Sequence, residues 1–118
     1  DRYDFNADLA DGLSFNDGCA TLTAFSAAGV ASGLSLFPKP VTKVVVCGGG
    51  RLNPFLMEEL NQRCPMPVVT AEDEGWRGDS IEAEAFAFLA VRSKRGLPLS
   101  FPGTTGVPHP LTGGKMIE

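Results

Sequence analysis

The stretch VVVCGGGRLNP at positions 44–54 decides the fold expected of this chain. It opens with a run of valines that shows no polar alternation, which is typical of a strand buried on both faces in a parallel sheet. The glycines at 48–50 then break the strand in a tight turn. Asn53 suits the N-cap of a helix and Pro54 its first position, so a helix is predicted from here to about residue 63.

The sequence on either side of this stretch predicts two more helices and one more strand. Residues 18–36 have apolar side chains at helical spacing, and Ser14 just ahead of them begins a helix-start pattern. After the central stretch, residues 67–70 read as a short strand. Residues 79–94 predict a helix that is apolar nearly all round, so we expect this helix to be buried.

The resulting order is helix, strand, helix, strand, helix, which predicts an α/β fold with parallel strands. The remainder, 97–118, is rich in Pro, Gly and Thr, and we expect an irregular C-terminal tail. Two strands are too few for a self-sufficient sheet. Either part of the fold is missing from this chain or a partner completes it.

Composition excludes several classes of partner. The net charge is −4 and no basic patch is visible, so neither a nucleic-acid surface nor an anionic membrane surface is expected. No apolar run is seen to approach the roughly 20 residues that span a bilayer, and the polar first residues do not suggest a signal peptide. The cysteines, Cys19, Cys47 and Cys64, form neither a CxxC pair nor a Cys/His cluster. We expect no zinc site and no disulfide framework, but buried free thiols in a reducing cytoplasm.

The glycine turn is the first candidate site. Glycines let a ligand approach the backbone, and the start of the next helix offers N–H groups and partial positive charge to a phosphate. The turn matches neither the GxGxxG nor the GxxxxGK[ST] pattern, so it could equally be a tight turn without a ligand. Arg51 could pair with a phosphate or be a surface charge, and we expect the acidic loop 72–74 to be solvated.

The second candidate site is the block GDSIEAEA at 78–85. Asp79 and Glu82 fit a capping box, which is a purely structural interpretation. In the functional interpretation, Glu82 is a carboxylate at the tip of a buried helix, and it points into a cleft beside the glycine turn. A Glu side chain held by its own N-cap is less free to meet a ligand, so the two roles coexist only in part.

Four blocks of the sequence together resemble the C-terminal part of the anhydro-N-acetylmuramic acid kinases. The blocks are DRYDF (1–5), VVVCGGGRLNPFLMEEL (44–60), GDSIEAEAFAFLAVRSKRGLP (78–98) and FPGTTGVPHPLTGG (101–114). The resemblance implies a partial ribonuclease H-like (actin-like ATPase) domain, with residues 1–118 as the C-terminal part of the second domain of a two-domain kinase. It further implies an ATP- and Mg²⁺-dependent, bacterial cytoplasmic enzyme of cell-wall recycling. That enzyme phosphorylates 1,6-anhydro-N-acetylmuramic acid with hydrolytic ring opening to N-acetylmuramic acid 6-phosphate.

The resemblance also assigns roles to single residues. Gly48, Gly49 and Gly50 match the turn that lies against the nucleotide, and Asn53 completes that motif. Glu82 matches a glutamate that reaches the anhydro-sugar. The phosphate-binding loop and the general-base aspartate of the family have no counterpart in this chain, which carries no catalytic residue and no metal ligand by this comparison. We therefore expect the chain alone to be inactive.

Family members are often homodimers, and exposed strand edges could pair between chains, so a homo-oligomer is expected. One alternative is a non-catalytic nucleotide-binding or assembly module of the same fold. Another is a sugar kinase of different specificity, against which Glu82 argues.

Overall fold

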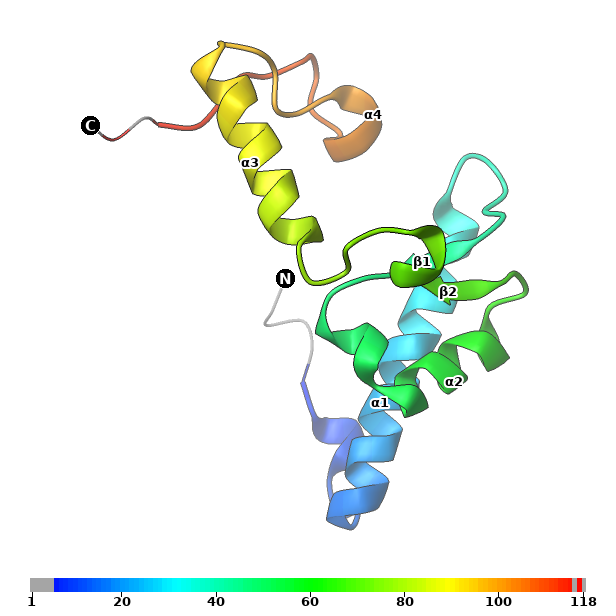
Figure 1. Ribbon diagram of the computed structural model, residues 1–118. Coiled ribbons are helices and arrows are strands. Elements are labelled where there is room, and N and C mark those ends of the chain that lie inside the picture. The colour runs from blue at the N-terminus through cyan, green and yellow to red at the C-terminus, as the bar shows by residue number, and fades with distance from the viewer. Residues whose placement is uncertain (1–5, 116, 118) are drawn as a thin grey trace. The chain divides into compact units, whose positions relative to one another are not determined.

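The computed structural model describes residues 6–115 and residue 117, arranged in two compact units. The first unit ends at Gly78 and the second begins at Asp79 (Figure 1). The block at 1–5 lies outside the described residues. The elements in chain order are η1 (Asp8–Ala10), α1 (Phe15–Gly33), η2 (Leu34–Leu36), β1 (Val44–Val46), η3 (Gly49–Leu52), α2 (Pro54–Arg63), β2 (Val68–Thr70), η4 (Glu72–Glu74), α3 (Ile81–Lys94) and α4 (Pro102–Thr105). The α/β class and the order helix, strand, helix, strand, helix are confirmed.

The long helix α1 begins where the sequence predicts. Ser14 is its N-cap, and the Ser14 hydroxyl oxygen accepts a hydrogen bond from the backbone N–H of Asp17 at 3.2 Å. The Asp17 carboxylate in turn accepts from the Ser14 hydroxyl at 2.7 Å. This reciprocal pair satisfies a backbone N–H that the helix itself cannot pair, which explains the sharp start.

Helix α1 and the 3₁₀ turn after it overturn one expectation from the sequence. Together they form the segment Phe15–Leu36, whose 22 residues are long and apolar enough, by length and composition only, to cross a membrane. The expectation that no apolar segment approaches this length is therefore wrong. Small and weakly polar residues such as Gly, Ala, Ser and Thr make up much of the segment. Large apolar side chains are therefore too widely spaced in it to indicate its full length.

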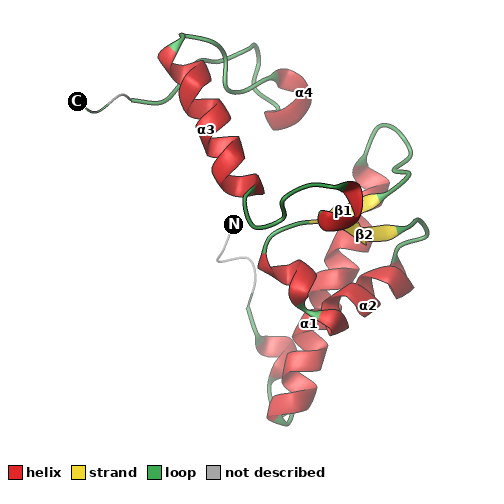
Figure 2. Ribbon diagram, viewed as in Figure 1, coloured by secondary structure: helices red, strands yellow, loops and turns green. Residues whose placement is uncertain are grey.

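The sheet of the first unit consists of two parallel strands (Figure 2). β1 pairs with β2 in the register Val44↔Val68, Val45↔Val69 and Val46↔Thr70. The hydrophobic core lies where α1, α2 and the strands meet, and its buried members are Ala27, Leu60, Cys64 and Val68. Among the described residues β1 has no strand on its other side, as expected for two strands taken from a larger sheet.

The valines of β1 are only half-buried, so the expectation of burial on both faces is wrong. Val44 and Val46 pack against the core from one face of the strand. Val45 alternates to the opposite face. Val45 is not among the hydrophobic side chains that pack against the core, so the strand is covered only in part.

The second unit is one helix with its tail packed along it. The Arg92 guanidinium donates to the carbonyl of Pro98 at 2.7 Å, and the Ser93 hydroxyl donates to the carbonyl of Gly113 at 2.7 Å. An antiparallel bridge joins Ser100 to Leu111. The tail was expected to be irregular, but between these contacts it forms the short helix α4. Side-chain hydrogen bonds to backbone carbonyls give it this order without a helical period in its sequence.

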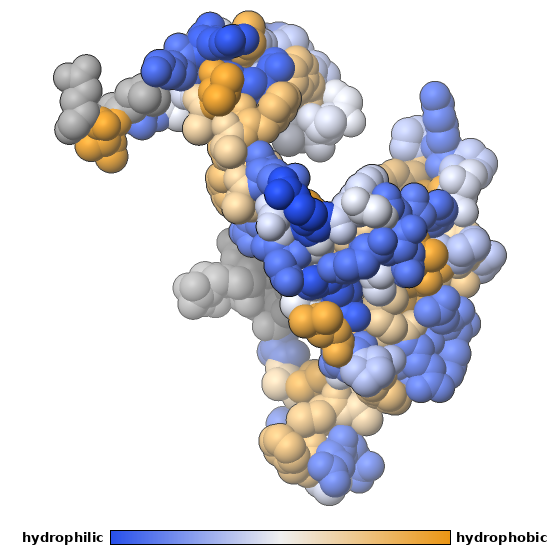
Figure 3. Space-filling view, viewed as in Figure 1, coloured by the Kyte–Doolittle hydropathy of each residue, from blue (hydrophilic) through white to orange (hydrophobic). Residues whose placement is uncertain are grey.

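Helix α3 is exposed, and the expectation that it is buried is wrong. Phe86, Phe88 and Val91 are exposed by 63%, 61% and 54%, and none of the helix's residues is buried. Figure 3 shows apolar surface along this helix. A helix that is apolar nearly all round needs cover on several sides. The second unit supplies only the tail, which covers one of them.

Candidate functional site

The glycine turn joins β1 to α2 and is exposed to solvent. Gly48 has φ 69° and ψ −172°, a conformation that only glycine adopts readily. A Cβ at Gly48 or Gly49 would meet nothing within 4 Å, so the space over the turn is open. Among the described residues, no acceptor takes the backbone N–H groups of Gly49 and Gly50. Two open N–H groups in a turn without side chains form a surface suited to anionic oxygens.

Asn53 caps α2 as predicted. Its side-chain oxygen accepts from the backbone N–H of Phe55 at 3.1 Å and of Leu56 at 3.2 Å. The backbone N–H of Asn53 donates to the carbonyl of Gly50 at 3.0 Å, which ties the cap to the glycine turn. Asn53 and the three glycines thus form one continuous surface. The carboxamide nitrogen of Asn53 is not needed for the cap.

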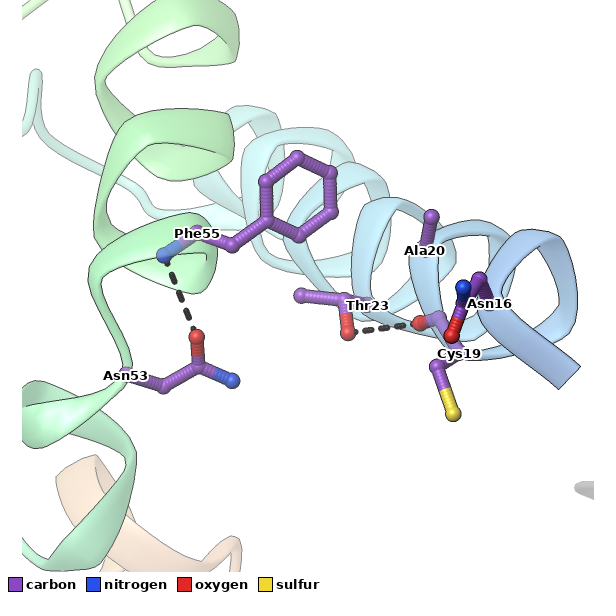
Figure 4. Close-up of a pocket in the computed structure, with 6 residues that line it drawn as sticks. All are labelled: Asn16, Cys19, Ala20, Thr23, Asn53 and Phe55. Atoms are coloured by element: carbon purple, nitrogen blue, oxygen red, sulfur yellow. Dashed lines mark hydrogen bonds between the residues drawn. The ribbon is translucent and has the colours of Figure 1, made fainter.

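A pocket of about 330 Å³ opens beside Asn53, between the starts of α1 and α2. Figure 4 shows the Phe55 ring and the Asn53 side chain on one wall and side chains of α1 on the other. The lining residues are Asn16, Cys19, Ala20, Thr23, Asn53 and Phe55. The walls combine an aromatic face with amide, hydroxyl and thiol groups, a mixture common in small-molecule sites. Sequence reasoning missed the α1 residues, because nothing local links them to a turn some 30 positions away.

Arg51 is buried, so the expectation that it is a surface charge is wrong, and the alternative, a contact with a phosphate, stays a prediction. Only 7% of the residue is exposed. Its Nη1 donates to the carbonyl of Gly48 at 2.8 Å, and its Nη2 lies 2.8 Å from Oε1 of Glu72. Its Nε lies 2.9 and 3.0 Å from the two oxygens of the same carboxylate. A guanidinium group suits this two-point contact with a carboxylate. The sequence does not reveal the pair, because the two residues are 21 positions apart.

The acidic loop at 72–74 is exposed, as expected, and each of its acids also has a partner within the chain. The Arg51 hydrogen bond holds the pKa of Glu72 below its ordinary value, assisted by backbone N–H groups and the Arg51 charge. Hydrogen bonds from the backbone N–H and the hydroxyl of Thr70, both 2.8 Å, lower the pKa of Asp73. Glu74 pairs with Lys43. Each acid of the loop therefore anchors the chain after β2 to a separate partner.

The Glu72 pairing predicts how acid affects folding. Because the folded-state pKa lies below the ordinary value of 4.5, the pair contributes stability above that pH and loses it as pH falls through the folded-state pKa. We expect Glu72→Gln to reduce stability at pH 7 and the difference from wild type to shrink as the pH falls below the ordinary value of 4.5. Urea unfolding of the chain, followed by fluorescence of Trp76, measures this. A difference that is constant from pH 7 to pH 3 would contradict it.

Glu82 lies in the first turn of α3 with its side chain exposed. The N-cap is Ser80 and the helix begins at Ile81, so the predicted capping box of Asp79 with Glu82 is wrong. The cap position has no side-chain hydrogen bond. The glycine turn and Glu82 belong to different compact units. The approach of Glu82 to the turn therefore stays a prediction.

The cysteines correct a further expectation. Cys64 is buried in the core of the first unit, but Cys19 and Cys47 are exposed, and all three are free. Cys19 lines the pocket beside Asn53. Within residues 6–115 and 117, no group of three or more His, Cys, Asp or Glu side chains is placed to hold a metal ion.

Comparison with known proteins places this site in a family. The family model for anhydro-N-acetylmuramic acid kinase matches residues 5–117. Proteins of that name from Rhizobium rhizogenes and Phenylobacterium zucineum are 57% and 56% identical over 118 residues, which is 100% of this chain and 32% of each relative. The protein of that name from Caulobacter vibrioides is 55% identical over 117 residues, 99% of this chain and 32% of the relative. The chain thus spans about a third of the length of the curated relatives it matches. Its parallel strands and helices are consistent with part of the actin-like ATPase fold of this family, and the chain belongs to the anhydro-N-acetylmuramic acid kinase family.

Proposed function

We propose that this chain forms the C-terminal part of the second domain of an ATP-dependent kinase for 1,6-anhydro-N-acetylmuramic acid in the bacterial cytoplasm. In the overall reaction, water adds at C1 of the sugar and the bond between C1 and the bridging oxygen breaks. That oxygen, which stays on C6, takes the γ-phosphoryl group of ATP, and ADP leaves. The observation that carries the proposal is the exposed glycine turn with two open N–H groups, inside a chain that the family model matches over residues 5–117.

The turn and its pocket support a nucleotide role. Gly48 and Gly49 leave the backbone open to a ligand, since a Cβ on either of them would meet no atom within 4 Å. The N–H groups of the turn suit anionic oxygens, and Asn53 adds an amide at the edge of the adjoining pocket. Phe55, which is 40% exposed, offers an aromatic face in that pocket. We propose that ATP lies along this surface.

Mg²⁺ accompanies ATP in this proposal, and its role is to neutralise charge that develops on the transferred phosphoryl group. Mg²⁺ usually keeps several waters and takes few protein ligands beside the phosphates. The described residues offer no cluster that fits a metal ion, so none of its ligands is assigned to this chain. The general base is likewise assigned to the part of the kinase that this chain does not span.

Glu82 is proposed to contact the sugar. It stands on the exposed first turn of a helix, where the helix dipole favours a negative charge and where the N-cap residue Ser80 makes no side-chain cap hydrogen bond. An ionised carboxylate accepts hydrogen bonds from hydroxyl or amide groups, which the sugar carries. A homo-oligomer is proposed on the same terms, because the outer edge of β1 and the apolar surface of α3 are uncovered in these units.

A chain-replacement experiment tests the proposed function. In a hybrid kinase, this chain replaces the aligned 118 residues of the Rhizobium rhizogenes relative. We expect the hybrid to release ADP from ATP only when the anhydro-sugar is present, at a rate within about tenfold of the unmodified relative. A folded hybrid that binds ATP but phosphorylates no sugar would support a non-catalytic nucleotide-binding module. A hybrid that phosphorylates another sugar would support different specificity.

The pocket provides a prediction about thiol chemistry. We expect saturating ATP–Mg²⁺ to slow alkylation of Cys19 in the hybrid by about tenfold or more, because a nucleotide in the pocket would cover the thiol. Peptide mass spectrometry after timed exposure to iodoacetamide measures the rate at each cysteine. Cys64 is buried and reports any unfolding. The anhydro-sugar alone is the matched control and should leave the Cys19 rate unchanged. Equal Cys19 rates with and without ATP would remove the pocket from the nucleotide site.

A further inference from the structure

One buried cation connects three segments around the glycine turn. Arg51 donates to the carbonyl of Gly48 through its guanidinium at 2.8 Å and through its own backbone N–H at 3.4 Å. The same guanidinium contacts both oxygens of Glu72. Gly78 lies against the same carboxylate, because a Cβ on Gly78 would meet Oε1 of Glu72. These four residues, Gly48, Arg51, Glu72 and Gly78, are called the Arg51 network below.

Gly78 packs directly against the ion pair of Arg51 and Glu72. The residue is buried, and a Cβ built on it would overlap Oε1 of Glu72 as well as Nε and Cζ of Arg51. A side chain at position 78 would therefore have to push the ion pair aside. The requirement for glycine here is one of space, because Gly78 is not among the glycines with positive φ.

The geometry of Gly48 shows what the network holds in place. Its backbone conformation is disfavoured for other residues and is costly to keep unless its surroundings fix it. Both hydrogen bonds from Arg51 end on its carbonyl oxygen, so they fix the orientation of the peptide between Gly48 and Gly49. That peptide carries the N–H of Gly49, one of the two open donors of the turn.

We propose that Arg51 is a positioning residue: with Glu72 and Gly78 it sets the Gly48 peptide so that the N–H groups of the turn face the nucleotide. This inference rests on the proposed nucleotide role of the turn and deepens it. An arginine that served only the salt bridge with Glu72 would not also need to donate to the carbonyl of Gly48, whose conformation shapes the turn. The cation acts through the backbone and does not itself contact ATP.

The test uses two substitutions in the hybrid kinase that disturb the network in different ways. Arg51→Met removes the guanidinium, and Gly78→Ala keeps both charges but displaces the pair. We expect each to raise the KM for ATP about tenfold or more, the loss typical of a displaced binding group, and to leave the KM for the sugar within about twofold. Arg51→Lys keeps the charge but not the fork, so it should recover little of the loss. If Arg51→Met does not fold, the KM values for ATP of Gly78→Ala and Arg51→Lys test the proposal instead.

The matched control is the ion pair between Arg63 and Glu59 on α2, whose N–O distance of 2.7 Å is similar. Arg63→Met breaks that pair in the same unit without touching the turn, and should leave both KM values unchanged. Folded Arg51→Met and Gly78→Ala variants with an unchanged KM for ATP would overturn the proposal. Equal rises in the KM for ATP and for the sugar would do the same, because they would indicate a general loss of structure.

A measurement on the 118-residue chain separates this proposal from the proposed function. The backbone N–H groups of residues 51 and 53 donate to the carbonyls of Gly48 and Gly50, so their hydrogen exchange reports the order of the turn. We expect Arg51→Met to speed both exchanges about tenfold, while amides in the middle of α1 keep their rates. Unchanged exchange would overturn the positioning role even if the hybrid is an active kinase. Faster exchange together with an inactive hybrid would support the positioning role of Arg51 and contradict the proposed kinase function.

Discussion

Glu82→Gln is expected to lower the kcat of the hybrid kinase by about a hundredfold or more, with little change in its thermal stability. The substitution keeps the size of the side chain but removes its charge, so a sugar that the carboxylate positions would lose its alignment with the γ-phosphate. Folding should tolerate the change, because the side chain is exposed on the first turn of α3 and the N-cap position of that helix has no side-chain hydrogen bond. Steady-state kinetics and a thermal melt measure the two effects.

Glu84→Gln is the matched control for this prediction. Glu84 lies two residues later in the same first turn, so it has a similar place along the helix but points to a different side. We expect its kcat to stay within about threefold of the unsubstituted hybrid. A Glu82→Gln variant with full activity would remove the sugar-contact role, and equal losses in both variants would assign the effect to the helix as a whole.

Gly49→Ala is expected to raise the KM for ATP of the hybrid about tenfold while the melting temperature stays the same. No atom lies within 4 Å of a Cβ at this position, and φ is not positive there, so the folded chain has room for the methyl group. Only a ligand that lies against the backbone of the turn would collide with it. Isothermal titration with ATP–Mg²⁺ and a thermal melt test both halves of this prediction.

Gly48→Ala provides the contrast. At φ 69° and ψ −172° a non-glycine residue is strained by about 1–3 kcal/mol, so this variant should lose stability as well as ATP affinity. The pair of variants separates the shape of the turn from its contact with ligand. If Gly49→Ala binds ATP as tightly as the unsubstituted hybrid, the nucleotide does not lie on the turn.

Local signals made much of the fold predictable from the sequence. The Ser14 start of α1, the Asn53 cap followed by Pro54, and the parallel β-branched strands depend on neighbours within a few residues, and all three are confirmed. The burial of α3 and of both faces of β1 was predicted wrongly. Burial depends on packing partners far along the chain or beyond it. An apolar pattern shows only that an element has a surface suited to packing, not that another element packs against it.

The candidate site was predictable only in part, for the same reason. The glycines at 48–50 and Asn53 form a contiguous motif, and the structure places them on one surface. Cys19 on α1 lines the pocket next to Asn53, and Glu72 is linked to the glycine turn by its ion pair with Arg51. Neither contact can be predicted from neighbouring residues in the sequence. Gly78 lies between charged residues, but nothing local in the sequence shows that its missing side chain leaves room for Arg51 and Glu72.

The most direct test of the central claim is the product that the hybrid kinase makes from ATP and 1,6-anhydro-N-acetylmuramic acid in ¹⁸O-labelled water. We expect a sugar 6-phosphate that carries one ¹⁸O atom at C1, because water adds there while the bridging oxygen stays on C6 and takes the phosphoryl group. Mass spectrometry of the product reads both features at once. A folded hybrid that yields no sugar phosphate, under conditions where the unmodified Rhizobium rhizogenes relative does, would contradict the account.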